Sequence, residues 1–572
     1  MKPSAYSSLA VICLFLMSAN PNLYPEKSSP DPRPIAMCGG GLDWELVIGD
    51  SAKAPVLFDN LGNFTFPIDT KNTEAQRYFD QGMKLYYGFN HAEAFKAFRQ
   101  AAMLDPASAM AWWGQALSLG PNINMPMMDS VGTITAWDAM QKAIAIGAKN
   151  QREKDIIETQ AVRYVKTYSG DRAALDAAYV EASRKLAMKY PNDSDILSLA
   201  AEAIMDVHSW DYWERDGKPK SWTGEILQTL EKAISTSPEH PGPNHFYIHA
   251  VEASRNPGMA MKSADLLMTI MPGAGHMVHM PSHIYIRTGE YSKGALSNIK
   301  AVSADENYFK TSYEEGLYSL GYYPHNIHFL WACAAFEGNF VQSMKAARDV
   351  QAKISTTMMV SPDYSVLQHL YATPMYNLVQ FGKWDEVLAE NLAFPNELYL
   401  KGVWSYGRGM AFVRKGKLES AREQLKELSA ALAGFGVAKK SAWINNPADI
   451  LKVAEKVLIA EMNAAEGKQE QAKQAFEEAV KSEDALRYNE PADWHKPVRQ
   501  SYGAYLIRIG DYSLAEKPLR EDLSFYPGNG WSLQGLYQAL QKQKNGKEAS
   551  ATLSQFNKSW TKADIKLTSS SF

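Results

Sequence analysis

Cysteine is scarce in this sequence: the chain of 572 residues contains three. Structural zinc sites need clustered cysteines, and small disulfide-rich proteins need a framework of paired ones, so the sequence supports neither class. Cys13 lies within an N-terminal apolar run. Only Cys38 and Cys333 remain for a single disulfide, and the sequence leaves open whether they pair.

The sequence also lacks a large excess of charge of one sign, and it lacks enzyme signature motifs. The formal net charge is −4 and the charged residues are interspersed, so no basic stripe offers a surface to nucleic acid. The sequence contains no HExxH motif, glycine-rich phosphate loop, nucleophile elbow or kinase signature. Enzyme classes other than metal-dependent ones therefore have no support from motifs, and a nucleic-acid partner is not expected.

Long apolar runs are missing as well. The run Leu9–Met17 has nine residues, which is too few to span a bilayer; it follows Lys2 and precedes small and polar residues. This arrangement is typical of a signal peptide, although a short membrane anchor is an alternative. We therefore expect residues 1–20 to be a signal peptide and the mature protein to be periplasmic or secreted, with no transmembrane segment after cleavage.

A repeat organises the rest of the chain, which is too long for a single compact core. Residues 21–70 are rich in Pro, Ser, Gly and Asn, which predicts a loosely structured lead-in. In a 34-residue unit that starts at Ala75, positions 8, 20, 24, 27 and 32 hold Gly82, Ala94, Phe98, Ala101 and Pro106. Gly-x-aromatic turns place further units along the chain, for example at Gly289 and Gly510.

This spacing resembles the tetratricopeptide repeat (TPR), in which two antiparallel helices pack through small residues and a proline follows the second helix. The resemblance covers residues 71–545 and implies an all-α fold, a right-handed helical-hairpin (TPR) solenoid whose first helices line a concave groove. The pattern is interrupted near residues 209–224, which predicts an insertion. Residues 546–572 are expected to form a C-terminal tail.

Histidines are concentrated in the stretch GAGHMVHMPSH, which contains no Lys, Arg, Asp or Glu. His276, His279 and His283 occupy positions 2, 5 and 9 of a repeat unit, and so lie within an arc of about 60° on one helical face. The TPR resemblance implies that this face lines the groove and contacts ligand. Corresponding positions of neighbouring units hold His245, His249, His325, His328 and His369, with Glu252 and Arg287 at further groove positions.

Clustered imidazoles of this kind favour a transition-metal site. Neutral imidazole is a common metal ligand, and the rings stay neutral because each added positive charge would repel the next. We predict that the metal ligands are His245, His249, His276, His279, His283, His325 and His328. We predict that Glu252, Arg287 and His369 line the groove beside them. A polar groove that binds an organic ligand, and histidines that merely pack in the core, are the alternatives.

Copper is the metal that this set of residues favours. Glu252 is the one carboxylate at a groove position near the histidines, which argues against a carboxylate-rich di-iron site. An imidazole-rich, cysteine-poor site in an exported protein suits copper best, with zinc and iron as alternatives.

The leading hypothesis is an exported TPR-repeat protein that binds a transition metal and acts as a copper-dependent oxidoreductase, although the sequence leaves open whether the metal is catalytic. The alternative is a non-catalytic TPR binding scaffold, such as an accessory component of a bacterial nutrient or polysaccharide-utilisation system, with a small organic ligand, peptide or glycan in its groove.

Overall fold

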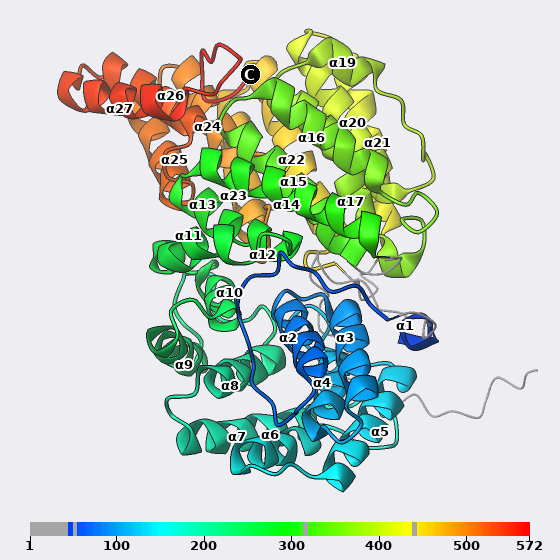
Figure 1. Cartoon of the computed structure of the whole chain (residues 1–572). Helices are drawn as coiled ribbons and strands as arrows, with labels where there is room; N and C mark the ends of the chain where they lie inside the picture. Colours follow the sequence, from blue (N-terminus) through cyan, green and yellow to red (C-terminus); the bar gives the residue numbers. More distant parts are fainter. Residues whose placement is uncertain (1–43, 50–53, 313–317, 437–442) are drawn as a thin grey trace, which may run out of the picture. The chain divides into compact units, whose positions relative to one another are not determined.

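Helices joined by short turns build the chain in the computed structural model (Figure 1). The structure describes residues 44–49, 54–312, 318–436 and 443–572. Within these ranges no β-strand occurs. Extended backbone pairs there only in two isolated β-bridges. The predicted all-α, helical-hairpin fold is therefore confirmed. The predicted signal peptide and Cys38 lie outside the described residues.

Nine helices form the first described part of the chain. They are α1 (Trp44–Gly49), α2 (Thr73–Tyr87), α3 (His91–Leu104), α4 (Ala109–Leu119), α5 (Ser130–Ile146), α6 (Gln151–Ala161), α7 (Ala173–Lys189), α8 (Ser194–Val207) and α9 (Thr223–Thr236). Several of these helices have an N-cap residue whose side chain accepts a hydrogen bond from a backbone N–H group of the first turn. Asn72 is the N-cap of α2. The irregular segment 208–222 between α8 and α9 lies where the sequence indicates an insertion.

The middle of the chain contains helices that proline interrupts. They are α10 (Pro241–Val251), η1 (Pro257–Ala260), α11 (Met261–Ile270), α12 (Gly275–His279), α13 (Pro281–Thr288), α14 (Tyr291–Thr311), η2 (Tyr318–Tyr322), α15 (Tyr323–Phe336), α16 (Phe340–Lys353), η3 (Pro362–Tyr364), α17 (Leu367–Tyr371) and α18 (Thr373–Gln380). Pro281 separates α12 from α13, and Pro374 separates α17 from α18. Proline has no backbone N–H and its ring collides with the preceding turn, so each helix breaks there.

Nine helices follow α18 in the described part of the chain. They are α19 (Trp384–Ala389), α20 (Leu398–Arg414), α21 (Leu418–Gly434), α22 (Pro447–Ala465), α23 (Gln469–Asp484), α24 (Val498–Arg508), α25 (Tyr512–Phe525), α26 (Gly530–Lys542) and α27 (Gly546–Ser559). Helix α27 lies within residues 546–572, the segment predicted to form a C-terminal tail. It packs on α26 because Ala549 joins Leu536 and Leu540 in one small hydrophobic cluster.

Small residues explain why the repeat pattern identifies the fold. Phe98 of α3 packs against Gly82 of α2 and Gly114 of α4. A Cβ atom at Gly82 or Gly114 would lie 2.5 or 2.4 Å from the phenyl ring, which is closer than atoms can approach. The repeated glycine and aromatic positions are therefore the points where helices approach most closely.

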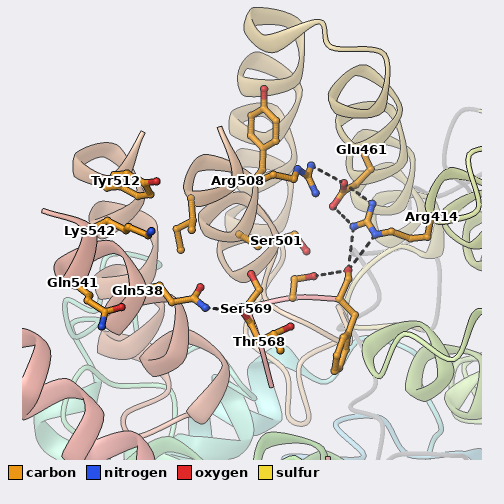
Figure 2. Close-up of a pocket in the computed structure, with 15 residues that line it drawn as sticks. Arg414, Glu461, Ser501, Arg508, Tyr512, Gln538, Gln541, Lys542, Thr568 and Ser569 are labelled. Atoms are coloured by element: carbon orange, nitrogen blue, oxygen red, sulfur yellow. Dashed lines mark hydrogen bonds and ion pairs between the residues drawn. The ribbon is translucent and has the colours of Figure 1, made fainter. Parts of the chain in front are cut away.

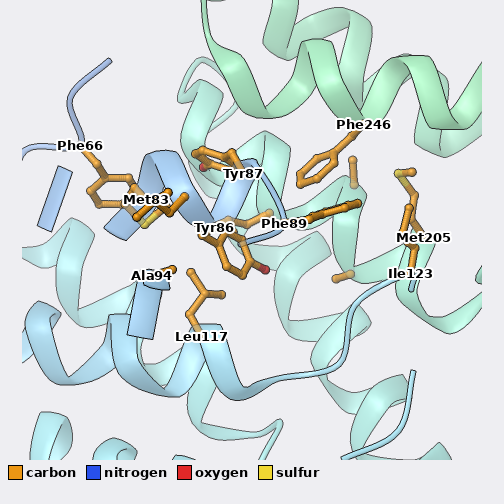
Figure 3. Packing of buried hydrophobic residues seen from close by; sticks show 14 of the residues in the cluster. Phe66, Met83, Tyr86, Tyr87, Phe89, Ala94, Leu117, Ile123, Met205 and Phe246 are labelled. Carbon is orange, nitrogen blue, oxygen red and sulfur yellow. The ribbon is translucent and has the colours of Figure 1, made fainter. Parts of the chain in front are cut away.

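Two large hydrophobic clusters form the core, and they meet at α13. One cluster contains Ile284 and extends from Trp44 to Tyr322, and the other contains Ile286 and extends to Ala539. Figure 3 shows part of the first cluster, where Phe89 lies between the helices that carry Tyr87 and Phe246. Among the described residues, no helix is both long and apolar enough to cross a membrane.

Candidate metal centre

Six of the seven predicted ligands come together in the interior. Helix α10 supplies His245 and His249, α12 supplies His276 and His279, α13 supplies His283 and α15 supplies His325. Residues four apart lie on the same helical face, so α10 and the α12–α13 pair each present two imidazoles to one point. All six side chains are buried, with at most 3% of their surface exposed.

Site A consists of His245, His249 and His276. The Nε2 atom of His245 lies 3.1 Å from Nε2 of His249 and 3.2 Å from Nε2 of His276. Two imidazole nitrogens bound tetrahedrally to one ion at about 2.0–2.1 Å are about 3.3 Å apart. The three nitrogens are therefore already close to the arrangement that one metal ion requires.

Hydrogen bonds leave the Nε2 atoms of His245 and His249 without protons. The Nδ1 of His245 lies 2.6 Å from the backbone oxygen of Tyr87, which can only accept, so Nδ1 carries the hydrogen. The Nδ1 of His249 lies 3.1 Å from Oε1 of Glu252. Burial and then the neighbouring imidazoles hold the pKa of His245 and of His276 well below the ordinary value. The bare Nε2 atoms of His245 and His249, 3.1 Å apart, repel each other unless a cation lies between them.

Site B consists of His279, His283 and His325. The Nε2 atoms of His279 and His283 are 2.9 Å apart, and all three rings offer a nitrogen within 4.8 Å of the others. The Nδ1 of His279 lies 2.7 Å from Oδ1 of Asn298, whose amide nitrogen donates to the Gly294 carbonyl, so this oxygen is an acceptor. Neither nitrogen of His325 has a hydrogen-bond partner among the described residues.

Glu252 connects the two sites. Its Oε1 accepts from Nδ1 of His249 in site A, and its Oε2 lies 2.5 Å from Nδ1 of His283 in site B. Burial alone would raise the pKa of Glu252, but the positive charge of His283 and the hydrogen bond from His249 lower it to about 2. An ionised carboxylate therefore orients one ring of each site and raises the basicity of both Nε2 atoms.

A third group of candidate ligands, formed by Glu252, His283 and Glu490, is better described as an ion-pair network. The contact of 2.5 Å between His283 and Glu252 leaves no room for an ion, because two ligand atoms of one ion are about 2.8 Å apart or more. Burial lowers the pKa of His283, but the charges of Glu252 and Glu490 outweigh it and raise that pKa to about 9. A proton therefore competes with a metal ion for His283.

A phenyl ring covers each site. Phe89 contacts all three rings of site A, with ring centres 4.5, 5.8 and 5.3 Å from those of its histidines. Phe329 contacts all three rings of site B, at 4.9, 4.5 and 5.1 Å. Phe89 and Trp210, which touches His249, both have positive φ angles, 56° and 60°. Such backbone strain in non-glycine residues is common at functional sites.

The surroundings differ from the open groove that the sequence predicts. Phe89 comes from the turn between α2 and α3, Trp210 from the α8–α9 connection and Glu490 from the segment before α24, and together they help to bury the histidines. Arg287, predicted to line the groove, is also buried. It donates to the backbone oxygens of Glu252 and Ser254, and so holds the end of α10 in place.

His328 and His369 belong to neither site. His328 stacks on Trp331 with ring centres 4.9 Å apart, and its nearest imidazole is that of His369, 5.7 Å away. The Nδ1 of His369 lies 2.6 Å from the Tyr399 hydroxyl. His328 lies about 60° around α15 from His325, and its ring faces Trp331 and His369 instead of site B.

The sequence interpretation misses the residues that complete the centre. Asn298, Phe89, Phe329 and Glu490 contact the histidines but lie outside the histidine stripe, and no pattern in the sequence distinguishes them. The acceptor for His245 is a backbone carbonyl, which has no sequence signal at all.

Comparison with known proteins finds likeness to solved structures at low sequence identity. No protein-family model matches the chain, and no curated protein matches it. Human IFIT1 bound to m7Gppp-AAAA is 13% identical, over 86% of this chain and 91% of that one, with a TM-score of 0.31. The APC/C hetero-tetramer Cut9–Hcn1 (13%, 87% and 80%, TM-score 0.30) and yeast Tom70 (13%, 87% and 93%, TM-score 0.25) are similarly distant. Scores this low identify neither a ligand nor an activity.

Proposed function

We propose that this protein is an exported metalloprotein that binds two copper ions, one in site A and one in site B, and acts as an oxidoreductase. The observation that carries the proposal is the convergence of six buried imidazoles in two groups of three. The Nε2 atoms of site A face one another, as do those of His279 and His283, while fixed acceptors hold several Nδ1 atoms. Export follows from the N-terminal apolar run and remains part of the proposal.

Packing alone does not account for these histidines. A buried imidazole in a protein core normally has its polar atoms hydrogen-bonded, because an unpaired buried group costs about 1–3 kcal/mol. Nδ1 of His276 and both nitrogens of His325 have no hydrogen-bond partner among the described residues. A metal ion would give one nitrogen of His325 a partner and would bind the facing Nε2 atoms of both sites at once.

Copper fits the donor set better than zinc or iron. Each site offers three nitrogen donors with no thiolate, and the nearby carboxylate of Glu252 is engaged with two imidazoles. Mononuclear non-haem iron sites commonly include a carboxylate ligand, and zinc with three histidines takes a water as its fourth ligand. Aromatic rings around both sites exclude water, which favours the softer Cu(I) state.

Metal analysis of paired variants tests the proposal. Wild-type protein from its native compartment is expected to contain two copper ions per chain. The double variants His245→Ala/His249→Ala and His279→Ala/His283→Ala should each retain one ion, because each removes two ligands from one site only. The matched control is His328→Ala/His369→Ala, which should retain both, since these rings lie outside the sites.

Elemental analysis, with circular dichroism to confirm the helix content of each variant, gives the answer. Wild-type protein that takes up no copper, zinc or iron after reconstitution would contradict the proposal. So would a control variant that loses as much metal as the site variants.

A second candidate function, a binding scaffold for a small organic ligand or peptide, is favoured by pockets away from the histidines. One has a volume of about 480 Å³ and lies among the C-terminal helices, where Arg414 pairs with Glu461 opposite Lys542 (Figure 2). Another, of about 1230 Å³, is lined by polar residues that include Arg152 and Asp193. Ligand binding in either pocket would persist in variants that have lost both metal sites.

A further inference from the structure

We infer that sites A and B form a single coupled pair of copper ions, and that this pair takes dioxygen as its substrate. The inference rests on the proposed function, because it needs both sites to bind copper. It adds that the ions act together and names the molecule that they would bind.

The two sites lie side by side, with rings of one in contact with rings of the other. His249 of site A and His283 of site B have ring centres 5.7 Å apart, and His276 and His279 have ring centres 5.8 Å apart. An ion lies about 3 Å from the ring centre of its ligand, so these contacts limit the separation of the ions to about 12 Å and allow a much shorter one. One carboxylate, that of Glu252, reaches a ring of each site.

Each ion would retain an open coordination position. Three imidazoles leave a fourth position free in a tetrahedral site, as in sites that bind a small reactant. Phe89 touches every ring of site A and Phe329 touches every ring of site B, so one side of each site is closed by hydrocarbon. The open position of each ion would therefore lie away from its phenyl ring.

The surroundings select a very small, uncharged reactant. All six ligand residues are buried, with at most 3% of each exposed. A drug-sized organic substrate needs a pocket of about 300 Å³ or more, and the pockets of about 480 and 1230 Å³ are lined by none of the six histidines. Ions enclosed in this way would be reached by a very small, uncharged molecule such as a diatomic gas.

The electron count requires both ions. Each Cu(I) gives one electron, so two Cu(I) reduce one dioxygen to the peroxide level and become two Cu(II). The O–O π bond is lost, two copper–oxygen bonds form, and no proton or further reductant is needed for this binding step. A single Cu(I) supplies only half of these electrons, which is why the proximity of the sites matters.

Dioxygen uptake by the reduced, copper-loaded full-length chain tests the inference. Protein shown by elemental analysis to hold two copper ions is reduced with ascorbate, separated from it without air, and then exposed to dioxygen. We expect one dioxygen bound per two copper ions, a new charge-transfer absorption band, and almost no electron paramagnetic resonance signal, because two coupled Cu(II) spins cancel. His245→Ala/His249→Ala, with one ion, should instead show one full Cu(II) signal after chemical oxidation and no such uptake.

Two full Cu(II) signals from oxidised wild-type protein, or uptake that is the same in the one-ion variant, would overturn the inference while leaving the metal sites intact. Failure of the proposed function has a different signature, since the protein would then hold no copper before the experiment begins.

Discussion

Glu252→Gln is expected to weaken copper binding at both sites together, by ten- to hundredfold at each. The carboxylate accepts from His249 of site A and pairs with His283 of site B, so its negative charge increases the basicity of a ligand in each. A glutamine oxygen can accept from one ring only, and its NH2 group would face the N–H of the other. Competition with a chelator of known copper affinity measures the affinity of each site.

The matched control for this variant is Glu202→Gln. Glu202 is also buried and accepts from the Tyr86 hydroxyl at 2.8 Å, but it contacts none of the six histidines. Burial, reinforced by Asp206, raises the pKa of Glu202 well above its ordinary value, so glutamine resembles the neutral acid already present. Equal losses in both variants, or a loss confined to one site of Glu252→Gln, would show that Glu252 does not serve the two sites jointly.

Copper loading is expected to stabilise the fold strongly. An ion that binds the folded chain alone adds about 4 kcal/mol to the free energy of unfolding when its free concentration is a thousand times its Kd, so two ions add about 8 kcal/mol. The added stability has a local cause in site A, because the ion there replaces the repulsion between the bare Nε2 atoms of His245 and His249, 3.1 Å apart, by coordination bonds. Differential scanning calorimetry with and without a chelator measures the shift in the unfolding temperature.

The quadruple variant His245→Ala/His249→Ala/His279→Ala/His283→Ala supplies the comparison for this effect. Its unfolding temperature should be the same with copper as with chelator, whatever the effect of the four substitutions on the protein itself. A shift as large as that of the wild type would mean that copper stabilises the fold from elsewhere.

Repeat spacing predicts much of the site because a helix fixes the direction of each side chain. Positions 2, 5 and 9 of successive units identify His276, His279 and His283 and the histidines of the neighbouring helices. The same rule fails for His328, because whether its ring meets site B depends on how α15 is rotated against α13. That rotation is set by packing between helices, and the spacing of residues within one helix carries no information about it.

Burial of the site is the part that the sequence does not predict. The TPR resemblance implies a groove open to ligand, whereas Phe89, Trp210 and Glu490 reach the histidines from three distant segments of the chain. Each of these contacts is long-range, and each residue type is common elsewhere in the sequence. The fold itself is easier to predict, because residues such as Gly82 and Phe98 act within a single repeat unit.

Anomalous diffraction at the copper absorption edge, from crystals of copper-loaded protein, tests the central claim most directly. The account predicts two anomalous peaks per chain, each about 2.0–2.1 Å from three Nε2 atoms. One peak belongs to His245, His249 and His276, and the other to His279, His283 and His325. Crystals whose copper content is confirmed but which show no peak at either group of histidines, or which show the copper beside His328 and His369 instead, would contradict it.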